Sequence, residues 1–254
     1  MSKDSDCLII LGGSSQLGQE LTKIAVENST SVISIDHFSI PDLDLAHPQV
    51  THLSHDLSQD FSFDSLREII GDARAVSMVF VASGRKHLSD SNAFFQAWEV
   101  QVKSLEEWSR RFLEVLQALE VDGLFVLISS INGQLVSHSN PRYGAIKAAA
   151  ESVISSYAMR ANSLGRGAFL TLRLGYIENI ATNDLSDWAT IQAKAANELV
   201  GMKNLVTWRD VAMLLQNMVS GRFGILNGSL LYADHGVHLI EQTHATVIGE
   251  RSRN

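Results

Sequence analysis

A serine, a tyrosine and a lysine in the middle of the chain have the types and spacing for proton transfer at a carbonyl or carbinol carbon. Tyr143 and Lys147 are four residues apart, so they share one face of a helix, and the lysine ammonium stabilises a tyrosine phenolate electrostatically. Ser130 precedes the tyrosine by thirteen residues and offers a hydroxyl to the same substrate oxygen. A Tyr–Lys pair at this spacing is by itself most often a solvated surface pair, so the surrounding sequence decides its meaning.

The serine follows a segment that has the pattern of a buried strand. Gly123–Ser130 is a short apolar run, bounded by glycine at one end and by two hydroxyl side chains at the other. Such runs are typical of strands in parallel sheets, which are covered on both faces. We expect Ser130 to lie at the carboxyl end of a strand, where open α/β sheets bind their ligands.

The first part of the chain has the pattern of a dinucleotide-binding turn. An apolar strand, Cys7–Leu11, is followed by the glycine turn Gly12–Gly18 and by a helical stretch, Gln19–Glu27. Free backbone N–H groups and the positive end of a helix favour an anion such as a diphosphate. A tight turn that needs glycine at positive φ is the alternative explanation.

An acidic residue lies where the adenosine ribose of a dinucleotide is expected. The strand-like run Ser31–Ile35 ends in Asp36, eighteen residues after Gly18, and a carboxylate at this distance accepts hydrogen bonds from ribose hydroxyls and repels a 2′-phosphate. His37 is the only potentially cationic neighbour, and the next Arg or Lys is Arg67. We therefore expect NAD(H) rather than NADP(H), although an ordinary turn carboxylate has the same sequence pattern.

These motifs, in this order from Leu8 to about Gly236, resemble those of the short-chain dehydrogenase/reductase family. The glycine turn of that family reads TGxxxGxG, and here Leu11 and Gln16 replace the threonine and the middle glycine. The family's NNAG motif is matched in part by Ala82–Gly84. The resemblance implies these cofactor-binding residues: Gly12, Ser14, Ser15, Gln16, Leu17, Gly18, Asp36, Asp56, Leu57, Ala82, Ser83, Gly84, Tyr143, Lys147, Gly175 and Ile177.

The resemblance also implies the catalytic residues. The serine, tyrosine and lysine of the family correspond to Ser130, Tyr143 and Lys147. The family's catalytic asparagine aligns best with Gln101, whose extra methylene displaces the amide group. Residues 178–207, after the strand-like Phe169–Leu174, correspond to a lid over the substrate.

Two long helical patterns predict an assembly. Asn92–Leu119 and Pro141–Leu164 carry apolar residues on more than one side, and a helix of that kind is buried against something. In the family that this chain resembles, the corresponding helices form a four-helix dimer bundle. We therefore expect a homodimer or a homotetramer.

Length and composition fit one α/β domain. The 254 residues are 45% hydrophobic, which suits the single doubly wound Rossmann-like domain, residues 1–254, with a mainly parallel seven-stranded sheet that the resemblance implies. The net charge of −8 disfavours nucleic acid and anionic membranes as partners. Cys7 is the one cysteine, and no apolar run approaches the ~18 residues of a membrane span, so we expect a cytoplasmic protein. The histidines lack the spacing of zinc ligands, so we expect no metal.

The sequence as a whole favours an NAD(H)-dependent oxidoreductase that interconverts a secondary alcohol and a ketone. In this interpretation Tyr143 moves the hydroxyl proton, Ser130 holds the substrate oxygen, Lys147 binds the nicotinamide ribose and Gln101 holds a relay water. An NAD-dependent sugar-nucleotide epimerase or dehydratase, which uses the same Tyr–Lys pair but recycles its cofactor, is one alternative. A non-catalytic NAD(H)-binding sensor is another, and no motif identifies the substrate.

Overall fold

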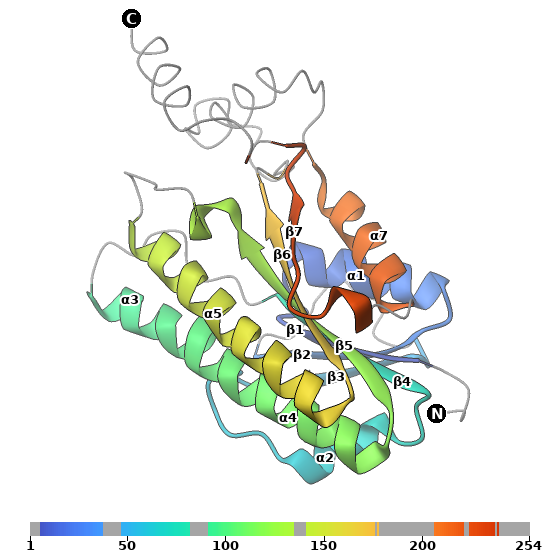
Figure 1. The fold of residues 1–254 in the computed structure, drawn as a ribbon. Helices are drawn as coiled ribbons and strands as arrows, with labels where there is room; N and C mark the ends of the chain where they lie inside the picture. The colour runs from blue at the N-terminus through green and yellow to red at the C-terminus, as the bar shows by residue number, and fades with distance from the viewer. Residues whose placement is uncertain are drawn as a thin grey trace, which may run out of the picture.

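Seven parallel strands form the centre of the protein (Figure 1). The computed structural model describes residues 6–37, 47–81, 91–134, 141–175, 177, 206–220, 224–236 and 238. The sheet has the order β3-β2-β1-β4-β5-β6-β7, and every pairing between these strands is parallel. This confirms the predicted Rossmann-like α/β class. The strands are β1 (Cys7–Leu11), β2 (Ser31–Asp36), β3 (Val50–Ser54), β4 (Ala75–Phe80), β5 (Asp122–Ser130), β6 (Ala168–Leu174) and β7 (Leu230–Ala233).

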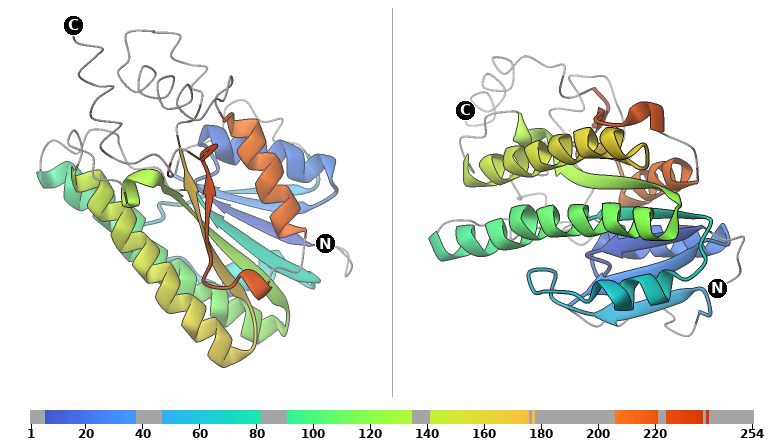
Figure 2. Two further views of the ribbon diagram at one scale, coloured as in Figure 1. Left: turned by 45° about the horizontal axis from the view of Figure 1, so that its top comes forward. Right: turned by 60° about the horizontal axis from the view of Figure 1, so that its bottom comes forward.

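Helices cover both faces of this sheet (Figure 2). Helices α1 and α7 pack together on one face, and α4 and α5 lie side by side on the other, so each face has its own apolar core. The aromatic rings of Phe125 and Phe169 stack under α4 and α5, with 5.2 Å between their centroids. The helical segments are α1 (Gln16–Glu27), α2 (Phe63–Ile70), α3 (Ser91–Trp98), η1 (Glu99–Lys103), α4 (Ser104–Leu119), η2 (Ile131–Gly133), α5 (Pro141–Leu164), α7 (Trp208–Val219) and η3 (Gly224–Leu226).

Some helix boundaries differ from the expectation. Helix α1 begins at Gln16, three residues before the expected start, because the Ser15 side chain caps it by accepting a hydrogen bond from the Gly18 N–H. The expected continuous helix Asn92–Leu119 is interrupted by η1, a π-helix. Helix α2, which is capped by Ser62, was not predicted.

The register brings the functional strand ends to one edge. The order of the strands reverses between β1 and β4, and Leu11 at the end of β1 pairs with Phe80 at the end of β4. Ser130 at the end of β5 pairs with Leu174 of β6, which pairs in turn with Ala233 of β7. A doubly wound sheet binds its ligand at this edge, beside the point where the strand order reverses.

Most of the expected lid lies outside the described residues. At the end of its range, Val206 pairs with Ile177 in an isolated parallel bridge. Within the described part of the chain, none of the helices combines the length and the apolar character of a membrane span.

Candidate active site

The glycine turn after β1 packs tightly against the start of α1. The turn begins at Gly12, which has a φ of 95° and donates its N–H to the Ile35 carbonyl at 2.9 Å. A methyl group on Gly18 would lie 2.7 Å from the carbonyl oxygens of both Gly12 and Gly13, so only glycine fits there without a shift of the backbone. The N–H groups of a first helical turn have no partners within their own helix. This close turn and helix start therefore suit a diphosphate.

Asp36 is tied to the glycine turn. Its Oδ2 accepts hydrogen bonds from the Ser14 N–H at 3.0 Å and from the Ser14 hydroxyl at 2.7 Å. The Nδ1 of His37 lies 3.4 Å from Oδ1 of the same carboxylate. The carboxylate predicted to contact the ribose is therefore fixed beside the turn predicted to bind the diphosphate.

Asp56 and Leu57 follow β3, next to the end of β2. The Asp56 carboxylate accepts hydrogen bonds from the backbone and the side chain of Ser58, and these bonds lower the pKa of Asp56. The backbone N–H of His55 donates to the Asp36 carbonyl at 2.9 Å. The structure thus brings two further predicted cofactor-binding residues, Asp56 and Leu57, to the strand end next to that of Asp36.

Tyr143 and Lys147 lie together on α5. The Lys147 side chain is buried, and its Nζ is 5.5 Å from the centroid of the Tyr143 ring. Ser130 ends β5, and its Oγ accepts a hydrogen bond from the Asn132 N–H at 3.2 Å. A methyl group on Gly144 would lie 2.7 Å from the Asn132 carbonyl oxygen, so α5 rests directly on the turn that follows Ser130. This contact brings the serine segment to the Tyr–Lys pair.

Gln101 lies in the π-helix η1, which packs against α5. Its side chain is buried, and neither amide atom has a hydrogen-bond partner in the part of the chain that the structure describes. Val102 and Ile146 belong to one small apolar cluster that joins the two segments. π-Helices are rare and occur often at functional sites. A buried amide without a partner normally costs stability, which marks Gln101 as a functional candidate.

The remaining predicted cofactor residues divide into two groups. Gly175 follows β6 and packs closely against Asp234 after β7. A methyl group on Gly175 would lie only 2.5 Å from the Asp234 Cβ. Gly175 and Ile177 therefore lie at the functional edge of the sheet. Ala82, Ser83 and Gly84 are outside the described residues.

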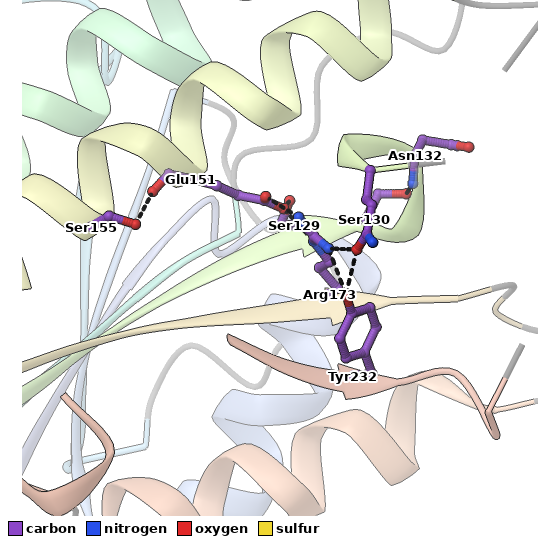
Figure 3. A network of polar contacts seen from close by, with 8 residues as sticks. Ser129, Ser130, Asn132, Glu151, Ser155, Arg173 and Tyr232 are labelled. Carbon is purple, nitrogen blue, oxygen red and sulfur yellow. Dashed lines mark hydrogen bonds and ion pairs between the residues drawn. The ribbon is translucent and has the colours of Figure 1, made fainter. Parts of the chain in front are cut away.

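Sequence reasoning missed a polar cluster beside Ser130 (Figure 3). Arg173 near the end of β6 forms a buried ion pair with Glu151 of α5, at 2.6 Å between Nη2 and Oε2. The hydrogen bonds with Glu151 raise the pKa of Arg173. Ser129 and Tyr232 also belong to the cluster. One sequence signal pointed to Arg173, though not to its partners, because it is a charged residue inside a mostly apolar strand.

These features define a dinucleotide-binding protein with a parallel Rossmann-like sheet, and comparisons with known proteins identify its family. Residues 50–238 match the family described as enoyl-(acyl carrier protein) reductase. The chain belongs to the short-chain dehydrogenase/reductase family, and its class of activity is NAD(P)-dependent oxidoreduction. No curated protein matches the sequence.

Solved structures show the same fold. A 4-hydroxyisoleucine dehydrogenase complexed with NADH has a TM-score of 0.79 at 17% identity, over 93% of this chain and 100% of that one. ElxO with NADP bound has a TM-score of 0.77 at 17% identity, with coverage of 93% and 100%. A 3-oxoacyl-[acyl-carrier protein] reductase from Brucella melitensis has a TM-score of 0.74 at 17% identity, with coverage of 95% and 100%.

Proposed function

We propose that this protein is an NAD(H)-dependent oxidoreductase that interconverts a secondary alcohol and a ketone. The observation that carries the proposal is the placement of the buried Lys147 beside Tyr143, on a helix that rests on the turn after Ser130. A phenol next to a buried cation is a suitable acid and base at a carbonyl oxygen. When bound, the nicotinamide supplies or accepts the hydride.

The three side chains have separate roles in this proposal. In the reducing direction the Tyr143 O–H donates its proton to the carbonyl oxygen, and in the oxidising direction the phenolate accepts the hydroxyl proton. The Ser130 hydroxyl donates a hydrogen bond to the same oxygen and holds it at the tyrosine. The Lys147 ammonium stabilises the phenolate and holds the nicotinamide ribose. Gln101 is proposed to order a water that connects this pair to solvent.

The preference for NAD(H) rests on Asp36. Its carboxylate lies at the end of β2, held by Ser14, where it would accept hydrogen bonds from two ribose hydroxyls and repel a 2′-phosphate. One solved relative has NADH bound and another has NADP bound, so the fold alone does not determine the cofactor preference. The proposed preference for NAD(H) therefore depends on the residues of this chain.

We also propose a homodimer or homotetramer in the cytoplasm. Met159 on α5, one of the two segments predicted to form the assembly, is 73% exposed. Met213 on α7, which lies outside those segments, is 50% exposed, so α5 and α7 both carry apolar side chains that a second copy would cover. Sedimentation of Met159→Lys and Met213→Lys tests the proposal. Loss of the dimer in Met159→Lys alone indicates a dimer through α5, and a wild-type monomer contradicts the assembly.

The activity is tested with a panel of secondary alcohols and ketones, and the absorbance of the nicotinamide serves as the readout. With the wild type, we expect at least one compound to cause net oxidation or reduction of the cofactor. With Tyr143→Phe, the rate of that reaction should be at least about a hundredfold lower. Turnover of a sugar nucleotide without a net cofactor change would instead establish the epimerase alternative. NADH binding without any turnover across the panel would favour the sensor.

A further inference from the structure

A buried ion pair joins α5 to the end of β6. The Arg173 Nε donates to Glu151 Oε1 at 2.9 Å, and Nη2 donates to Oε2 at 2.6 Å, so the pair is bidentate. The two side chains are only 9% and 10% exposed. The Ser129 hydroxyl donates to the same Oε1 at 2.6 Å, which ties the carboxylate to β5 as well.

The other edge of the Arg173 guanidinium faces the turn after Ser130 and the last strand (Figure 3). Its Nη1 donates to the Tyr232 hydroxyl of β7 at 2.7 Å and also to the side-chain carbonyl of Gln134. The Tyr232 hydroxyl donates to that same Gln134 oxygen at 2.5 Å. One guanidinium therefore connects helix α5 and strand β7 with the turn that begins at Ser130.

This network holds the elements that carry Ser130, Tyr143 and Lys147. Glu151 is one helical turn beyond Lys147 on the same face of α5. Ser129 comes directly before Ser130, and Gln134 comes four residues after it. The turn also lies against the carboxylate, because a methyl group on Gly133 would be 2.8 Å from Glu151 Oε1.

We propose that Glu151 and Arg173 are positioning residues that fix Ser130 relative to Tyr143 and Lys147, an inference that rests on the proposed function. Apolar side chains of similar volume would hold the fold equally well, because buried ion pairs often contribute no net stability. A bidentate guanidinium differs from apolar packing in that it fixes direction as well as distance. Misplacement of reacting groups by about 1 Å is enough to reduce a rate a hundredfold.

The test replaces the polar network with apolar residues. The triple variant Ser129→Ala, Glu151→Leu, Arg173→Met removes both charges of the ion pair together, so neither is left buried without its partner. It also removes the Ser129 hydroxyl, which would otherwise lose its acceptor. We expect the melting temperature to be unchanged or higher, KM to change less than about threefold and kcat to fall at least about tenfold. Ser155→Ala is the matched control, because among the described residues its hydroxyl donates only to the Glu151 backbone carbonyl on the same helix. It should keep wild-type kcat.

A second readout requires no substrate. In crystal structures we expect the Ser130 Oγ to move relative to Lys147 Nζ by at least about 0.5 Å in the triple variant, the tolerance of a preorganised site. If the triple variant does not fold, Arg173→Lys takes its place, because it keeps the charge and loses the bidentate geometry. A variant with wild-type kcat and an unmoved Ser130 overturns the proposal. A wild type without turnover refutes only the proposed function, and the movement of Ser130 then decides the positioning role.

Discussion

Replacement of Gly18 by alanine is expected to separate cofactor binding from folding. The added methyl group would lie 2.7 Å from the carbonyl oxygens of Gly12 and Gly13, and ordinary contact begins at 3.4 Å, so the turn and the helix must separate by about 0.7 Å. Overpacking of this kind costs about 1–3 kcal/mol. Alanine in place of glycine within a helix recovers about 1 kcal/mol of the folding cost, so the net loss is about 0–2 kcal/mol and the protein should stay folded, with a melting temperature lower by no more than about 8 °C.

The favourable helix propensity of alanine stabilises the fold but not the bound cofactor, because a diphosphate needs the turn and the helix start at their original separation. A penalty of about 2 kcal/mol corresponds to a Kd for NADH that is roughly thirtyfold higher. Titration calorimetry measures this Kd, with Gly224→Ala as the control, because no other described residue comes within 4 Å of a methyl group at Gly224. Equal NADH affinity in Gly18→Ala and wild type would refute the assignment of this turn as the diphosphate site.

Three further predictions concern Asp36, Gln101 and Cys7. Calorimetry should give NADH at least about tenfold tighter binding than NADPH, and Asp36→Asn should reduce this to within about threefold; a wild type that prefers NADPH contradicts the assignment. Gln101→Leu removes a buried amide that has no partner among the described residues, so the melting temperature should not fall, whereas turnover should fall at least about tenfold; unchanged turnover removes Gln101 from the mechanism. Burial raises the pKa of the Cys7 thiol to about 12 from the usual 9.0, so iodoacetamide should label the folded protein near neutral pH no faster than it unfolds. Because the folded state keeps a proton that the unfolded chain loses, the free energy of unfolding should decrease as pH rises from 9.0 toward 12, and rapid labelling of the folded protein would contradict this burial.

The sequence was sufficient for features that depend on local pattern. Helix α5 has the predicted bounds, Pro141–Leu164, and the predicted buried strand before Ser130 differs from β5 by one residue at its start. Both elements have strong signals, a proline at the first helical position and a run of apolar residues bounded by glycine. The spacing of Tyr143 and Lys147 then places them on one face, as the structure shows.

Features that depend on contacts between distant segments could not be predicted. Glu151 and Arg173 meet because α5 crosses the end of β6, and neither periodicity nor spacing reveals that crossing. The π-helix around Gln101 is also not visible in the 3.6-residue periodicity of the sequence, because it departs from that period over a single turn. Helix α2 is short, and its local signals are the caps at its two ends, Ser62 and Gly71.

The most direct test of the account measures deuterium transfer from NADH labelled at nicotinamide C4 to a ketone identified in the substrate panel. Wild type and Tyr143→Phe should bind NADH with similar affinity, and transfer should be at least about a hundredfold slower in the variant. Tyr157→Phe, which changes a buried tyrosine on the same helix, should keep the wild-type rate. If Tyr143→Phe transfers deuterium at the wild-type rate, Tyr143 is not the acid and base, and the central claim is wrong.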